Sequence, residues 1–213
     1  MPDLTKSLAA ACVLALQLAP REAVAGPLSL FLEGELGGSY SNVIAFTNTM
    51  LLPGVSVPGA TETKLVGSRF GAFAGVFVGP VGFGLHGALS RFSPYDIGTL
   101  GPELRVRLPT PLVQPYARLQ GGYAWLGAVN AQQVWRCMPT STSTQCPSVA
   151  GWYLGAGLGI DFLLGRYISV GGDLGLDILN FSRSASPTTV DYTMEGSSVG
   201  LQATLAAHAT LRL

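Results

Sequence analysis

The chain has few charged residues, little cysteine and no long apolar run beyond its first 25 residues. Charged side chains make up 11% of its 213 residues, whereas a soluble domain usually carries about 25%. The formal net charge is zero, so the basic excess typical of nucleic-acid binding is absent. Without an apolar run of about 18 residues, transmembrane helices are excluded. The chain is nevertheless apolar, with a mean hydropathy of +0.40, which is unusual for a soluble protein.

The first 25 residues are expected to be a secretory signal peptide. Lys6 supplies a positive start, residues 8–18 are mostly apolar, and Ala23 and Ala25 form a small-x-small cleavage site. A lipoprotein signal lipidated at Cys12 is the alternative, although little apolar sequence precedes that cysteine. Residues 26–213 are then expected to form one domain, because their number suits a single core.

The two cysteines beyond the leader, Cys137 and Cys146, are expected to form a disulfide, because they are an even pair in an exported chain. The segment between them is rich in Ser, Thr and Pro, which is loop composition. Two cysteines with no histidine nearby make a poor metal site. We therefore expect no metal, and nothing in the sequence implies a cofactor.

Eight segments alternate between apolar and polar or small residues with a period of two, which predicts β-strands. They are residues 28–40, 64–78, 81–92, 99–108, 115–126, 151–163, 167–181 and 199–213. The last segment alternates up to the final residue, Leu213, and is about as long as a tilted membrane-crossing strand. Short connections (79–80, 109–114 and 164–166) alternate with longer or more polar ones (41–63, 93–98, 127–150 and 182–197).

Alternating short turns and long loops are typical of outer-membrane barrels. A closed barrel also satisfies the backbone hydrogen bonds of an apolar chain in lipid without helices. The predicted fold class is therefore all-β: an eight-stranded antiparallel up-and-down transmembrane β-barrel.

The polar face of these strands is rich in glycine and carries charges of both signs, which suits a narrow lumen. We predict an ion-pair network of six acids and five arginines inside the barrel. Its members are Glu33, Glu35, Arg69, Glu103, Arg105, Arg107, Arg118, Asp161, Asp173, Asp177 and Arg212. The alternative is a soluble lipocalin-like barrel with its apolar face inside and a small ligand bound there.

The apolar face carries almost no charge. Arg91 is the exception, at the end of the third segment, where its side chain could snorkel to the membrane surface. Aromatic residues near the outer strand ends are expected to form a girdle at the membrane interface. They are Tyr40, Phe92, Trp125, Trp152 and Phe181.

With these features, residues 27–213 resemble the eight-stranded outer-membrane barrels: the transmembrane domain of outer membrane protein A and the small X-type and Ail-type proteins. The resemblance is one of architecture and not of a motif. It implies a place in the bacterial outer membrane, contact with membrane lipid and lipopolysaccharide, and insertion by the barrel assembly machinery through the C-terminal strand. That strand ends in Leu213, whereas the assembly signal usually ends in an aromatic residue.

We expect a structural or surface-interaction (adhesin-like) role, because an eight-stranded barrel is just wide enough for side chains to fill. Residues 41–63, which include Phe46 and Met50, and residues 127–150, which include Trp135, are the candidate sites for an extracellular ligand. The alternative is that their apolar residues extend the barrel wall or pack on each other. A narrow gated ion channel is the alternative. A lipid-A-modifying enzyme is less favoured, since neither His86 nor His208 has a serine two residues away, as the deacylase family does. We therefore expect no enzymatic activity.

Overall fold

The computed structural model describes residues 28–43, 64–93, 95–127, 149–165, 167–183 and 196–213. This part of the chain forms eight strands. They are β1 (Ser29–Val43), β2 (Lys64–Val78), β3 (Val81–Arg91), β4 (Asp96–Arg107), β5 (Val113–Gly127), β6 (Val149–Leu163), β7 (Ile168–Arg183) and β8 (Gly196–Arg212). No helix among the described residues is long and apolar enough to cross a membrane.

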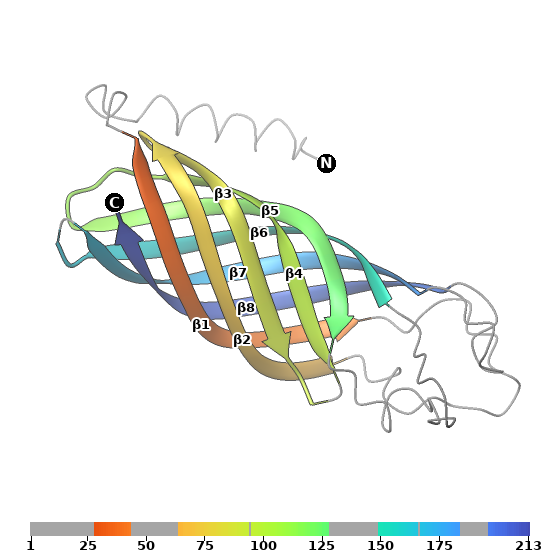
Figure 1. Ribbon diagram of the computed structural model, residues 1–213. Coiled ribbons are helices and arrows are strands. Elements are labelled where there is room, and N and C mark those ends of the chain that lie inside the picture. The colour runs from red at the N-terminus through yellow and green to blue at the C-terminus, as the bar shows by residue number, and fades with distance from the viewer. Residues whose placement is uncertain (1–27, 44–63, 94, 128–148, 166, 184–195) are drawn as a thin grey trace, which may run out of the picture.

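Each strand pairs antiparallel with its neighbours in sequence, and β1 pairs with β8, so the sheet closes into a barrel (Figure 1). The predicted eight-stranded up-and-down barrel is thereby confirmed. At the seam, Leu30 and Leu213 exchange two backbone hydrogen bonds of 2.9 Å each. The C-terminus lies at the same end of the barrel as the short β2–β3, β4–β5 and β6–β7 connections, which we call the turn end; the opposite end is the loop end (Figure 1).

The strand bounds follow the sequence pattern closely, and those of β2 match the predicted segment at both ends. The largest shifts are at strand ends facing the predicted long loops, as in β4, which begins at Asp96 and not at residue 99. It starts earlier because Ile97 packs inside the barrel and is only 1% exposed. The β2–β3 turn is two residues long, and Gly79 adopts a φ of 59° there, a left-handed conformation that favours glycine.

The side-chain distribution is the reverse of that in a soluble barrel. Large apolar residues on all eight strands face outward, with Val66 80% exposed and Leu158 68% exposed. Arginines, glutamates and aspartates are buried in the interior, with Arg105 and Asp161 fully inaccessible. The lipocalin-like alternative is therefore wrong, because it would bury the apolar face. This distribution suits lipid outside and satisfied polar groups inside.

Candidate functional site

The barrel lumen holds the chemistry-bearing side chains of the described residues. The acidic and basic residues predicted to form an internal network all point inward, because on each strand they share the parity of the inward face. Ten of them are buried: Glu33, Glu35, Arg69, Glu103, Arg105, Arg107, Arg118, Asp161, Asp173 and Asp177. Arg212 is partly buried, with a side chain 15% exposed at the turn end.

A bidentate ion pair in the lumen joins β1 to β4. Arg105 donates two hydrogen bonds to Glu33, from Nη1 to Oε2 at 2.8 Å and from Nη2 to Oε1 at 2.7 Å. Its Nε contacts Glu103, and the guanidinium carbon lies 4.2 Å from the ring centroid of Phe73. Thr210 donates a further hydrogen bond of 2.8 Å to Glu33. Every face of the Arg105 guanidinium therefore meets an acid or an aromatic ring.

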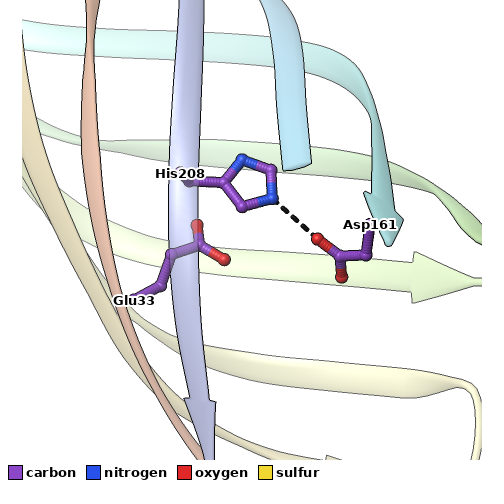
Figure 2. Close-up of side chains that lie close together, drawn as sticks. All are labelled: Glu33, Asp161 and His208. Carbon is purple, nitrogen blue, oxygen red and sulfur yellow. Dashed lines mark hydrogen bonds and ion pairs between the residues drawn. The ribbon is translucent and has the colours of Figure 1, made fainter. Parts of the chain in front are cut away.

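Glu33, Asp161 and His208 lie close together near the turn end (Figure 2). His208 Nε2 is 2.6 Å from Asp161 Oδ1, and one ligand-type atom from each residue lies within 4.8 Å of the others. Such a set could in principle hold a divalent cation. However, both acids already have arginine partners. Asp161 Oδ2 lies 3.3 Å from Arg107 Nη2 and 3.4 Å from Arg212 Nη2. Glu33 is paired with Arg105. With three guanidinium groups around these acids, the cluster is better described as an ion-pair node than as a metal centre.

A second group of charges occupies the middle of the lumen. Glu35 accepts a 2.9 Å hydrogen bond from Arg69 and lies 3.6 Å from Arg118, which in turn donates a 2.6 Å hydrogen bond to Asp173. Asp177 accepts a hydrogen bond of 2.7 Å from Gln120. These contacts connect β1, β2, β5 and β7 through side chains alone.

Both described histidines are held between two carboxylates. His86 Nε2 is 3.3 Å from Glu35 and its Nδ1 is 3.6 Å from Glu103. His208 has Asp161 at Nε2 and Asp173 at Nδ1, the latter at 3.4 Å. Each imidazole therefore bridges two acids inside the barrel.

Apolar clusters close the polar core at both ends. Towards the loop end, nine buried residues pack together: Leu65, Phe92, Tyr95, Ile97, Ala124, Val149, Tyr153, Leu179 and Phe181. Towards the turn end, Phe31, Phe73 and Phe77 form a smaller cluster. There the guanidinium of Arg107 lies 3.9 Å from the ring centroid of Phe77 and 4.3 Å from that of Phe31. Buried side chains, apolar at the two ends and charged between them, therefore line the described lumen.

No protein-family model and no curated protein sequence matches the chain. The structure, however, is similar to Neisserial surface protein A, with a TM-score of 0.54 and 12% identity over 87% of this chain and 99% of that one. It is also similar to the outer membrane protein OprG from Pseudomonas aeruginosa, with a TM-score of 0.50 and 12% identity over 90% of this chain and 98% of that one. This is the fold of an eight-stranded outer-membrane β-barrel.

Three of the five aromatic residues predicted to form a girdle lie on the outer face of the barrel. Tyr40 and Trp152 face outward, 41% and 52% exposed. Trp125 is half-buried on the outer face, where its ring covers Gly98 of the neighbouring strand and stacks on Tyr123 at 5.9 Å.

The prediction is wrong for Phe92 and Phe181. They are 7% and 0% exposed and belong to the apolar cluster inside the barrel. Phe181 shares the parity of Asp177 on β7, and Phe92 follows two residues after Ser90, which faces inward on β3. Strand alternation therefore predicts that both rings face the lumen. Their closeness to a strand end does not show which face they occupy.

Several lumen residues were not among the predicted site residues. They include buried aromatic residues and two glutamines, of which Gln120 donates to Asp177 and Gln202 to Ser39 and Ser90. The set is Phe31, Tyr116, Tyr153, Gln120 and Gln202. The same parity argument identifies them, since Tyr116 and Gln120 flank Arg118 on the inward face of β5. Their neutral or apolar chemistry gave no electrostatic signal.

Three predictions fall outside the described residues. They are the signal peptide at residues 1–25, the disulfide between Cys137 and Cys146, and most of the loop ligand regions at residues 41–63 and 127–150. They stay predictions.

Proposed function

We propose that this protein is a closed barrel of the outer membrane whose lumen is a structural core, and that it acts through surface interactions at its loop end. The observation that carries the proposal is the set of paired charges buried in the lumen: Arg105, Arg118 and Asp161 are at most 2% exposed, and each is paired. Buried pairs of this kind hold their strands together, because separating them leaves charges uncompensated.

The apolar clusters at both ends argue against a solute pore. A hydrated ion would have to displace Phe181 and Leu179 near the loop end and the Phe31–Phe77 ring pair, whose centroids are 4.4 Å apart, near the turn end. An eight-stranded barrel has little interior volume beyond its own side chains. These features favour a structural lumen over a transport path.

A narrow gated channel is the second candidate. It is supported by several buried charged atoms that have no hydrogen-bond partner among the described residues, among them Arg69 Nη2 and Arg118 Nη1. Such atoms could exchange partners and open a path. An enzymatic role has less support, because both described histidines bridge acids inside the lumen.

Conductance in planar bilayers separates the two candidates. The folded protein should give no discrete current steps over a wide voltage range. A matched variant, Phe181→Ala, removes a large ring from the loop-end cluster and tests whether that cluster keeps the lumen closed. Discrete steps from the unaltered protein would overturn the closed-lumen proposal and favour the gated channel.

The surface role follows from the sequence of the loop-end connections. Residues 44–52 contain Ile44, Phe46, Met50, Leu51 and Leu52, an apolar composition suited to partner binding. Replacing residues 44–52 with Gly and Ser of equal length should abolish adhesion of expressing cells to host cells or matrix. The same replacement at residues 185–193 is the control, and both variants must still show the gel-mobility shift of a folded barrel between unboiled and boiled samples. Unchanged adhesion in the first variant would reject this binding surface.

A further inference from the structure

The exposed basic side chains of the described residues lie at the loop end of the barrel's outer face. Five of the described basic side chains lie inside: Arg69, Arg105, Arg107, Arg118 and Arg212. The two others, Lys64 and Arg91, are exposed on the outer face of the neighbouring strands β2 and β3. Lys64 is the first residue of β2 and Arg91 the last of β3, so both are at the loop end.

The height of Arg91 on the barrel coincides with the margin of the lipid-facing band. β3 runs from Val81 at the turn end to Arg91, ten residue steps, or about 33 Å along the strand. At a strand tilt of about 40° this spans about 25 Å along the barrel axis, which is the usual height of the outward apolar band. Arg91 therefore lies where hydrocarbon gives way to headgroups, and Lys64 lies about 10 Å further out, four residues beyond the Arg91 partner Ser68.

The local contacts keep the Arg91 guanidinium near the barrel wall and accessible. Its carbon lies 5.8 Å from the ring centroid of Phe70, and its side chain is 62% exposed. Among the described residues, the acid paired with it is Asp96, at 3.9 Å, a distance too long for a close hydrogen bond. Between the levels of Lys64 and Arg91, Val66 and its partner Tyr40 provide an exposed apolar surface.

We infer that Lys64 and Arg91 bind the phosphates of lipid A, the membrane-embedded part of lipopolysaccharide. The short turns of outer-membrane barrels face the periplasm, so the loop end lies in the outer leaflet. That leaflet consists of lipopolysaccharide, whose lipid A carries phosphates at the boundary between acyl chains and sugars. Arginine matches phosphate geometry with two parallel donors, and lysine adds a point charge. The acyl chains would then lie on the apolar wall below, beside Phe70.

This inference rests on the outer-membrane location in the proposed function, but its test is independent of conductance and adhesion. The refolded full chain, free of lipopolysaccharide, is titrated with purified lipid A in detergent, and bound lipid is measured by native mass spectrometry. Arg91→Gln and Lys64→Gln should each weaken binding about fivefold, and the double variant about 25-fold. Lipid A without phosphates should bind the unaltered protein as weakly as intact lipid A binds the double variant.

Two further variants test whether lipid A binding can be strengthened at this site and whether it is unaffected by a change elsewhere on the outer face. Asp96→Asn should tighten binding, because it removes the acid that competes for Arg91; weaker binding would overturn the inference. Asn180→Ala is the matched control, since Asn180 is a neutral residue of the outer face near the loop end of β7, four strands away from β3. Its affinity should equal that of the unaltered protein.

Folding of each variant is checked by the gel-mobility shift on boiling. If Arg91→Gln does not fold, Arg91→Lys replaces it and should retain most of the affinity for lipid A. Equal binding by the double variant, or by lipid A without phosphates, would overturn the site. Equally strong competition by phosphatidylglycerol vesicles would overturn the assignment to lipid A, because the site would then respond to any lipid phosphate.

Discussion

Replacing Glu33 with alanine should destabilise the barrel by leaving the Arg105 guanidinium without its main partner. Glu33 accepts two hydrogen bonds from Arg105 and one from Thr210, and it is 2% exposed. Removing one member of a buried ion pair costs about 3–5 kcal/mol. Because Glu103 still contacts Arg105 in the variant, we expect the lower end of that range, about 3 kcal/mol.

Two companion variants set the scale of this effect. Thr210→Val removes one neutral donor from the same carboxylate and should cost about 1 kcal/mol. Arg105→Met removes the shared cation and leaves both Glu33 and Glu103 without it, so it should cost more than Glu33→Ala. The predicted order of destabilisation is therefore Arg105→Met, then Glu33→Ala, then Thr210→Val.

The free energy of unfolding can be measured by urea titration in detergent micelles, with the folded fraction read from gel mobility without boiling. A Glu33→Ala cost no larger than that of Thr210→Val would refute the reasoning. It would mean that water enters the lumen and screens the charges, and the structural role proposed for the network would then lose its basis.

Three further predictions concern packing and membrane assembly. Phe181→Ala should lower the free energy of unfolding by about 3–5 kcal/mol, because the ring is fully buried. The lipid-facing Trp152→Ala should lower it clearly less; the two variants are compared by heating each and following the loss of the folded band on gels of unboiled samples. Gly101→Ala should destabilise the barrel by about 1–3 kcal/mol, because the added Cβ would overlap the Gly121 carbonyl oxygen of β5. In Gly34→Ala the added Cβ meets no atom within 4 Å, so the same urea titration should show unchanged stability. Leu213→Phe should raise the folded fraction recovered in outer membranes if the barrel assembly machinery reads a terminal aromatic residue; an unchanged fraction would contradict that reading.

Strand identity could be read from the sequence because it depends on a local property. Side chains alternate between the two faces of any strand, so the period-two pattern of residues 64–78 predicted both ends of β2. The glycine-rich face with charges of both signs further indicated which side was the lumen. Phe181 illustrates the same rule, since its parity with Asp177 already placed it inside.

The partners within the lumen depend on long-range geometry that alternation does not contain. Glu33 and Arg105 are 72 residues apart, and Thr210 and Glu33 are 177 apart. Which acid meets which arginine is decided by the stagger of all eight strands on closure, a property of the whole sheet. The sequence alone therefore determined the strands, their faces and the near balance of internal charge. Only the tertiary structure decided the pairings, the apolar clusters at both ends of the lumen, and the placement of Lys64 and Arg91 on neighbouring strands at the loop end.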